Sequence, residues 1–310
     1  MRNKPFHVPT LLVTGSNGQV GFELRRSLAS LGRVVALDRA ACDLTRADLI
    51  RHAVRECRPD VIVNAAACTG MDRAETDAEG AFAINATAVG ILAEEAKRLG
   101  SLLVHYSTDC VFDGRQDVPY VETDAVNPIS VYGRSKLAGE QAIAAVGPVA
   151  LVLRTSWVAG VHGNNFAKTM LRFGREQAAI RVIRDRFGAP TGAALIADVT
   201  AQIVARRWLF GERQAFPQGV YHLAAAGETS PYGYAREVLQ YAVDKGVALK
   251  AGPAQLQAIP ASEYPLLAAR LASSRLDTAK LRGIFGIHLP DWRLGVHHLL
   301  DQILPEASQP

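Results

Sequence analysis

Cysteine is scarce in this sequence, and the cysteines that are present lie far apart. Only four occur among 310 residues, at Cys42, Cys57, Cys68 and Cys110, and no two form a Cys-x-x-Cys pair. Neither they nor the eight histidines show the spacing of zinc ligands. We therefore expect reduced thiols, no metal site and a cytoplasmic protein.

Long apolar runs and blocks of charge are also missing. No apolar stretch approaches the roughly 18–20 residues that cross a bilayer, and residues 1–7 lack the apolar core of a signal peptide. The 34 basic and 30 acidic residues are interspersed and leave a net charge of +4. We expect the protein to bind neither membranes nor nucleic acids.

The first half of the chain alternates predicted strands with predicted helices. The 310 residues are enough for one large or two modest domains. This alternation predicts an α/β fold, a doubly wound parallel sheet of the Rossmann type, whose ligands lie at the carboxyl ends of the strands. The predicted strands are 10–14, 33–38, 60–67, 102–107 and 149–155, and the predicted helices are 22–31, 78–99 and 130–146.

Beyond about residue 157 the alternation weakens. The helical patterns there are 166–177, 193–208 and 232–245, with a strand at 219–224. We predict a dinucleotide-binding domain at residues 9–157, to which residues 193–224 return. Residues 158–192 and 225–305 are predicted to form a smaller, mostly C-terminal α/β region that binds the substrate.

Three glycines follow the first predicted strand. Gly15, Gly18 and Gly21 are spaced three residues apart, between that strand and a helical pattern. Glycine lets the backbone turn sharply and approach a pyrophosphate, whose charge is favoured by the N-terminus of the next helix. The segment predicts a dinucleotide-binding loop rather than a plain turn.

The second predicted strand ends in Asp38, and Arg39 follows it. A carboxylate at this place typically binds the adenine-ribose hydroxyls of NAD, whereas an arginine pairs with the 2′-phosphate of NADP. The two residues together leave both NADH and NADPH open as the cofactor.

Tyr132 and Lys136 lie one helical turn apart, and Thr108 falls at the end of the strand predicted at 102–107. A free phenol has a pKa of about 10, and a neighbouring positive charge moves that pKa toward neutrality. We expect Tyr132 to transfer a proton, Lys136 to lower its pKa, and Thr108 to bind the same substrate oxygen.

Several neighbouring residues allow two interpretations. Trp157 is either a core residue or a stacking surface at the cleft, and Asn165 is either the N-cap of a helix or a ligand contact. His105, Ser107 and Asp109 are the residue types of a hydrolase triad. Side chains two apart on one strand cannot form its relay, so we do not expect a hydrolase.

Several motifs, in order along the chain, resemble those of the extended short-chain dehydrogenase/reductases, and within them the branch that reduces nucleotide-linked keto-sugars. The resemblance covers about residues 10 to 305. It implies that a reduced nicotinamide delivers hydride to the 4-keto group of dTDP-4-dehydro-L-rhamnose, giving dTDP-L-rhamnose. The motifs lie at residues 18–21, 61–67, 105–109, 131–133, 154–158, 164–170 and 185–191.

The resemblance also implies roles for individual residues. Tyr132 would give its proton to the nascent alkoxide, Lys136 would hold the nicotinamide ribose, and Thr108 would tune the proton transfer. The implied cofactor contacts are Gly15, Gly18, Gln19, Val20, Asp38, Arg39, Asp43, Leu44, Ala65, Ala66, Ala67, Tyr106, Tyr132 and Lys136. The implied contacts of the nucleotide sugar are Thr108, Asp109, Trp157, Asn165 and Phe166.

The chain departs from that family at several positions. Cys110 stands where tyrosine is usual, and residues 270–274 replace an Arg-Pro-x-Asn-Ser motif at the sugar-nucleotide end. Some relatives form a dimer linked by magnesium through glutamates. Here Glu23 remains, but Ala194 and Gln302 replace the others, so we expect no such magnesium site and a monomer or weak homodimer.

Three other functions remain open. A nucleotide-sugar epimerase or a dehydratase would use the same Tyr132 and Lys136, although a dehydratase needs an acid, typically glutamate, where this chain has Cys110. A non-catalytic subunit similar to the regulatory partner of methionine adenosyltransferase would share the fold and act by binding an enzyme.

Overall fold

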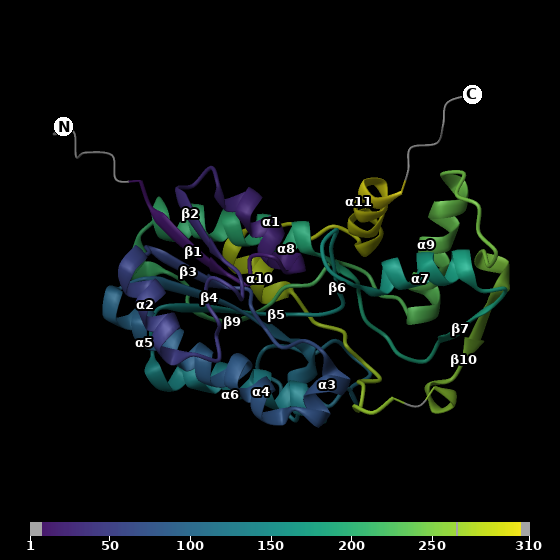
Figure 1. Cartoon of the computed structure of the whole chain (residues 1–310), viewed down its shortest axis with the longest axis horizontal. Helices are drawn as coiled ribbons and strands as arrows, with labels where there is room; N and C mark the ends of the chain where they lie inside the picture. Colours follow the sequence, from purple (N-terminus) through teal and green to yellow (C-terminus); the bar gives the residue numbers. More distant parts are fainter. Residues whose placement is uncertain (1–7, 265, 305–310) are drawn as a thin grey trace.

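A six-stranded parallel sheet forms the centre of the computed structural model, which describes residues 8–264 and 266–304 (Figure 1). The order across the sheet is β2-β1-β3-β4-β5-β9, and every neighbouring pair is parallel. The predicted doubly wound α/β fold is therefore confirmed. The strands are β1 (Thr10–Thr14), β2 (Arg33–Leu37), β3 (Val61–Asn64), β4 (Leu102–Thr108), β5 (Ala150–Thr155) and β9 (Gly219–His222).

Helices cover both faces of this sheet because its central strands are apolar on both sides. In β1, Leu11 and Val13 pack in one core with residues of α1 and α8, whereas Leu12 packs in a second core with residues of α2, α5 and α6. Figure 1 shows the first pair of helices above the sheet and the other three below it. The helices are α1 (Gln19–Leu28), α2 (Ala47–Cys57), α5 (Ala88–Leu99), α6 (Val131–Val146) and α8 (Ala193–Ile203).

The helix predicted at 78–99 is present but not uniform. It consists of α4 (Ala78–Phe82), a π-helical stretch η1 (Ala83–Thr87) and α5, and a short α3 (Met71–Thr76) precedes it. Asn85 in the π-helical stretch is fully buried and bonds both the backbone of Cys68 and the hydroxyl of Ser135 on α6. This polar anchor holds α6 against the helix and so fixes the place of Tyr132.

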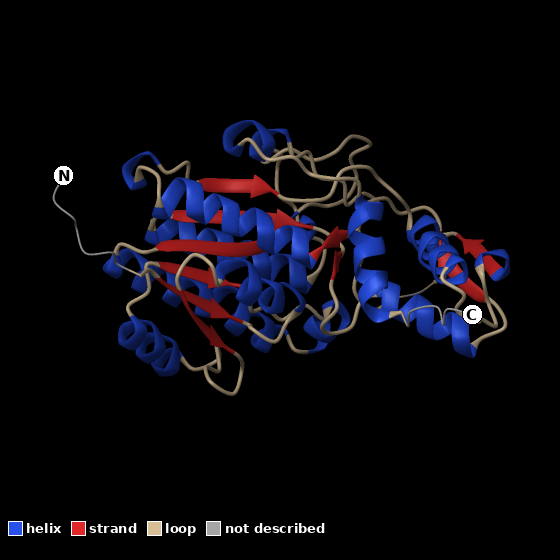
Figure 2. Ribbon diagram, turned by 90° about the horizontal axis from the view of Figure 1, so that it is seen from above, coloured by secondary structure: helices blue, strands red, loops and turns tan. Residues whose placement is uncertain are grey.

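A smaller part of the molecule lies beyond the carboxyl ends of the strands (Figure 2). It holds two small parallel sheets, β6 (Val158–Ala159) with β8 (Thr191–Gly192) and β7 (Ile180–Ile183) with β10 (Leu256–Ile259). Its helices are α7 (Phe166–Glu176), α9 (Pro231–Asp244) and α11 (Trp292–Ile303). The remaining short helices of the chain are η2 (Asp109–Val111), η3 (Val204–Leu209), η4 (Arg213–Ala215), η5 (Pro253–Gln255), η6 (Ala261–Glu263) and α10 (Ala279–Phe285).

The packing supports the prediction that residues 193–224 return to the dinucleotide-binding domain, and the domain boundaries stay a prediction. α8 and β9, from residues 193–224, bury Ile196 and Tyr221 in a core of the large sheet. α10 also enters that core, through Leu281 and Phe285, although the prediction assigns it to the substrate-binding region. No helix in the described part of the chain is long and apolar enough to cross a bilayer.

Candidate active site

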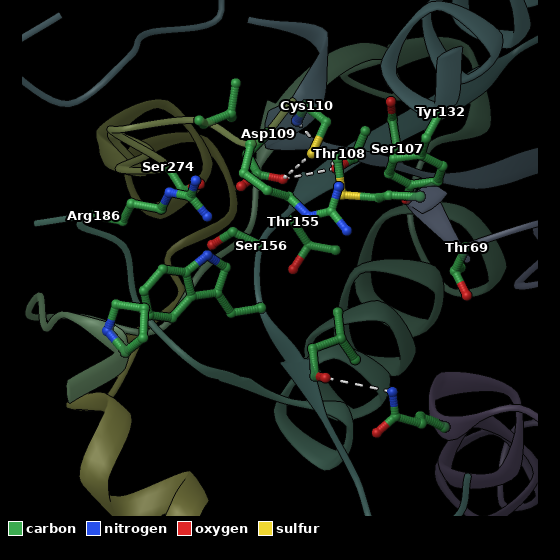
Figure 3. A pocket seen from close by; sticks show the side chains of 17 residues that line it. Thr69, Ser107, Thr108, Asp109, Cys110, Tyr132, Thr155, Ser156, Arg186 and Ser274 are labelled. Carbon is green, nitrogen blue, oxygen red and sulfur yellow. Dashed lines mark hydrogen bonds between the residues drawn. The ribbon is translucent and has the colours of Figure 1, made fainter. Parts of the chain in front are cut away.

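A cavity of about 430 Å³ lies where the carboxyl ends of β4 and β5 meet the beginning of α6. Figure 3 shows Thr108, Asp109 and Tyr132 on one side of it and Arg186 on the other. Trp157 also lines it. Ligands of doubly wound sheets bind at this edge, so the fold brings the predicted catalytic and substrate residues together at the expected place.

The first turn of α6 holds Tyr132 close to the end of β4. Ser130 caps the helix, because its Oγ accepts a hydrogen bond from Gly133 N at 3.1 Å. A Cβ at Gly133 would lie 2.1 Å from the carbonyl oxygen of Cys110. Only glycine therefore lets the helix begin this close to Thr108 and its neighbours.

Burial raises the pKa of Tyr132 above its usual value of 10. The neighbouring Thr108 side chain acts on this pKa in the opposite direction and is outweighed. This is contrary to the expectation from the sequence, in which Lys136 lowers the pKa of the phenol. In the structure, removal of the phenolate from water is the larger effect.

Lys136, one turn beyond Tyr132 on α6, is only 2% exposed and is not among the residues that line the cavity. Its Nζ donates to the carbonyl oxygen of Tyr106 at 2.6 Å and lies 3.3 Å from His105 Nε2. Burial lowers the pKa of Lys136 from 10.5 to about 8, against a smaller raising effect of Glu140. At mildly alkaline pH, Lys136 therefore exists in both its charged and its neutral form.

Thr108 and Asp109 form a hydrogen-bonded pair beside Tyr132. Thr108 Oγ1 donates to Asp109 Oδ1 at 2.7 Å and accepts from Cys110 N at 3.1 Å. Burial raises the pKa of both the Asp109 carboxyl and the Cys110 thiol. A thiol with a raised pKa is a poor acid and nucleophile, so the hydroxyl is the group here suited to bind a substrate oxygen.

The glycine loop after β1 forms a cradle that side chains would fill. Gly15 has a φ of 67°, and a Cβ there would lie 2.6 Å from backbone atoms of Ala66. A Cβ at Gly21 would lie 2.0 Å from the carbonyl oxygen of Gly15, so α1 begins directly against the loop. The N–H groups of the first turn of α1 have no acceptor within the helix and can donate to an anion here, so the cradle fits a dinucleotide pyrophosphate.

Asp38 and Arg39 follow β2 at the other end of this loop. Asp38 accepts hydrogen bonds from Asn17 Nδ2 at 2.8 Å and from Ala41 N at 2.9 Å. The Arg39 side chain is 77% exposed and lies 3.9 Å from Asp43. A fixed carboxylate and an exposed guanidinium thus lie side by side, so both NADH and NADPH fit.

Gln19 joins the glycine loop to the smaller part of the molecule. Its Oε1 accepts from Gly160 N at 2.8 Å and from Asn165 Nδ2 at 3.0 Å. Asn165 also caps α7 by accepting from Lys168 N. The N-cap interpretation of Asn165 is confirmed, and the same side chain bonds the residue that begins α1.

Trp157 lines the main cavity and also a second, apolar cavity of about 370 Å³. Its φ of 46° lies in the left-handed region, and Gly188 packs directly against its indole. Phe166 and Tyr234 line the apolar cavity, with ring centroids 5.0 Å apart. Trp157 therefore forms a wall between two cavities and also packs against the core of the smaller part of the molecule.

Some predicted residues lie away from the main cavity. The Tyr106 hydroxyl bonds Thr200 on α8 at 2.7 Å, so only its carbonyl oxygen faces Lys136. Leu44 is buried in the core below the sheet, and Asp43 accepts hydrogen bonds within its own turn. Phe166 lines the apolar cavity instead.

Other cavity residues were missed by the sequence reasoning. Arg186 and Arg270 both line the cavity, and the buried hydroxyl of Thr155 has no hydrogen-bond partner within the described residues. The turn at 185–191 and the altered segment at 270–274 were the available signals. Nothing in the sequence shows that the two segments meet.

Comparisons with known proteins agree with this geometry. A family model described as the RmlD substrate binding domain matches residues 9–304. A dTDP-4-dehydrorhamnose reductase of Burkholderia thailandensis is 47% identical over 286 residues, which are 92% of this chain and 96% of that protein. The enzyme of the same name from Salmonella typhimurium is 46% identical over 302 residues, 96% and 99% of the two chains.

Solved structures show the same relationship. The dTDP-4-dehydrorhamnose reductase of Bacillus anthracis, solved in complex with NADP, has a TM-score of 0.85 and 30% identity, over 96% of this chain and 100% of that one. A Thermus thermophilus UDP-glucose 4-epimerase complex with NAD has a TM-score of 0.76 at 21% identity, over 94% and 98%. The epimerase shares the fold alone.

Proposed function

The chain belongs to the family of the RmlD substrate binding domain, and we propose that it reduces the 4-keto group of dTDP-4-dehydro-L-rhamnose with NADH or NADPH, giving dTDP-L-rhamnose. This reaction is the last step of dTDP-rhamnose synthesis. The observation that carries the proposal is the meeting of Tyr132 and Thr108 at one wall of a cavity that the glycine loop adjoins through Gln19.

Tyr132 is the proton donor in this proposal. When bound, the reduced nicotinamide supplies the hydride for the 4-keto carbon. The phenol is protonated at neutral pH, and burial raises its pKa further, so its proton remains available until negative charge develops on the sugar oxygen. Thr108, whose hydroxyl donates to Asp109 at 2.7 Å, would turn its one proton from Asp109 to the same sugar oxygen and orient it.

The dinucleotide is proposed to lie along the carboxyl ends of β1 to β4. The glycine loop would hold the pyrophosphate, Asp38 and Arg39 the adenosine end, and Lys136 the nicotinamide ribose. The small side chains after β3 leave room for it. The proposed cofactor residues are Gly15, Gly18, Gln19, Val20, Asp38, Arg39, Asp43, Leu44, Ala65, Ala66, Ala67, Tyr106, Tyr132 and Lys136.

The nucleotide sugar is proposed to enter from the side opposite Tyr132. Arg186 and Arg270 both line the cavity, and guanidinium groups pair well with the oxygens of a diphosphate. Trp157 would contact the sugar. Asn165 and Phe166, at the beginning of α7, would contact the nucleotide.

The other functions are less well supported. A dehydratase needs a carboxylate at position 110 to remove a ring proton from the sugar. Burial raises the pKa of the Cys110 thiol well above its usual value, so the thiol stays protonated and cannot accept that proton. The relatives at 46–47% identity are reductases by name. Tyr132 and Lys136 are both in place beside the cavity, and no observation favours a non-catalytic subunit.

The deciding experiment is the loss of NADPH or NADH absorbance on adding enzymatically generated dTDP-4-keto-L-rhamnose. The wild type should oxidise the cofactor rapidly, and Tyr132→Phe should lower the rate by about a hundredfold to ten-thousandfold. Tyr264→Phe, at an exposed tyrosine, is the matched control. The UDP-linked sugar tests the nucleotide. A dinucleotide that binds but is oxidised by no keto-sugar would overturn the proposal.

We also propose a monomer or weak homodimer in the cytoplasm. Glu23 accepts a hydrogen bond from Arg26 on its own helix. Ala194 and Gln302 offer no carboxylate for a bridging magnesium. The described residues contain no group of three or more His, Cys, Asp or Glu placed to hold a metal ion. Light scattering with and without magnesium tests this proposal.

A further inference from the structure

A row of buried hydrogen bonds leads across the sheet from the glycine loop to Lys136. Thr14, Asn64 and His105 are directly opposite one another on β1, β3 and β4, so their side chains share one face of the sheet. Thr14 Oγ1 donates to Asn64 Oδ1 at 2.6 Å, and Asn64 Nδ2 lies 3.0 Å from His105 Nδ1. His105 Nε2 lies 3.3 Å from Lys136 Nζ.

The direction of these hydrogen bonds determines which ring nitrogen of His105 carries the proton. Because Asn64 turns its oxygen to the Thr14 hydroxyl, its N–H group faces His105, and Nδ1 must accept. A neutral imidazole that accepts at one nitrogen carries its proton on the other. Nε2 then donates toward Lys136. Only a neutral amine can accept that proton, because an ammonium has no lone pair.

The surroundings of Lys136 fit a group that changes its charge. Its Nζ donates to the Tyr106 carbonyl oxygen and forms no ion pair within the described residues. The acid that acts on it, Glu140 on the same helix, is itself paired with Arg154 from β5. The other titratable group in contact with it is His105 on β4, and Tyr132 lies one turn earlier on α6.

We propose that His105 is a positioning residue that changes tautomer as Lys136 gains or loses a proton. Beside neutral Lys136, Nε2–H donates to Nζ and the Asn64 amide donates to Nδ1. Beside the ammonium, Nζ donates to Nε2, the imidazole carries its proton on Nδ1, and Asn64 turns its oxygen to accept it. The Asn64 amide then donates to the Thr14 hydroxyl, which accepts as readily as it donates.

Both arrangements keep a hydrogen bond between each neighbouring pair of side chains in the row. This matters because a buried donor or acceptor without a partner costs about 1–3 kcal/mol. The row lets Lys136 change its charge in the core without leaving such a group behind. This part of the argument rests on the proposed function: Lys136 would then change charge in step with the proton that Tyr132 gives up.

The test is nitrogen NMR of the free protein with ¹⁵N-labelled histidine, in which His105 is assigned by its absence from His105→Gln. We expect a neutral imidazole throughout about pH 6 to 10. Its proton should be on Nδ1 at the acidic end and on Nε2 at the alkaline end. A single tautomer over the whole range, or an imidazolium, would overturn the proposal.

Two variants sharpen this test. The ionised carboxylate that Asn64→Asp introduces offers only acceptors to Nδ1, so His105 should stay in the Nδ1–H tautomer. The inflection that Lys136 causes in the pH profile of kcat/KM should then move to an at least tenfold lower proton concentration. Thr14→Val removes only the far bond and should keep the switch. The NMR uses no substrate, so a protein without reductase activity could still show the switch, and an active reductase could still lack it.

Discussion

Arg154 on β5 and Glu140 on α6 form a two-pronged ion pair inside the protein. Arg154 Nε lies 2.9 Å from Glu140 Oε1 and Nη2 lies 2.7 Å from Oε2, with both side chains less than a tenth exposed. Ser107, which lines the cavity, donates to the same Oε1 at 2.5 Å. The pair therefore ties the helix of Tyr132 to the sheet directly behind the proposed active site.

Arg154→Met is expected to lower the free energy of unfolding by about 3–5 kcal/mol, because it leaves the Glu140 carboxylate buried without a charged partner. Combining it with Glu140→Gln should recover part of this loss, since both charges are then removed. Chemical denaturation of the two single variants and the double variant gives the coupling energy. Losses that simply add would contradict a direct interaction.

Lys136→Met is expected to stabilise the protein near neutral pH while abolishing reduction. Burial lowers the pKa of Lys136 from 10.5 to about 8. Between these values the unfolded chain binds more protons than the folded one, so the stability of the wild type rises with pH across this window. Methionine has no such dependence.

The stability advantage of Lys136→Met should therefore shrink by about 3 kcal/mol between about pH 7 and 10.5. Urea denaturation of both proteins at the two pH values measures it. Other titrating groups cancel in the difference. An advantage that stays constant with pH would mean that Lys136 is charged throughout the range.

Gly188→Ala is expected to displace the indole of Trp157. A Cβ at Gly188 would lie 2.8 Å from Trp157 Cε2, and Trp157 already has a positive φ. We expect KM for the nucleotide sugar to rise about tenfold, or about 1.4 kcal/mol, with a smaller change in kcat. Gly192→Ala is the control, since its Cβ would meet Gly295 at an ordinary 3.7 Å. Similar kinetics in both variants would argue against a sugar contact of Trp157.

Arg39→Ala is expected to separate the two cofactors. The exposed guanidinium of Arg39 is available to a 2′-phosphate, whereas Asp38 is already held by Asn17 and Ala41. KM for NADPH should rise about tenfold and KM for NADH should stay unchanged. Arg25→Ala, at an exposed arginine of α1, controls for net charge. An equal loss with both cofactors would place Arg39 outside the 2′-phosphate site.

The sequence was sufficient for the parts of the site that follow from strand order. Gly15, Thr108 and Trp157 each follow a predicted strand, and parallel strands bring their carboxyl ends to one edge. The meeting of Arg186 with Arg270 depends on how two irregular segments cross outside the sheet. No periodicity or spacing encodes that crossing.

The electrostatics were less predictable than the positions. The spacing of Tyr132 and Lys136 correctly indicates one helical face, but the direction of the Tyr132 pKa depends on how far the phenol is removed from water. In the sequence, His105 stands out only among the residue types of a hydrolase triad, which it cannot form. Its partner Asn64 becomes visible only through the pairing of β3 with β4.

The hydrogen bonds of Gln19 have a consequence for how the binding of one ligand affects the binding of the other. Its side-chain oxygen is shared by Gly160 and Asn165, both in the smaller part of the molecule. A dinucleotide that contacts Gln19 alters these two hydrogen bonds. A nucleotide sugar that moves Asn165 alters the hydrogen bonds that hold the Gln19 side chain. By linkage, each ligand changes the affinity for the other by the same factor. On these proposed contacts, we expect that the two substrates do not bind independently.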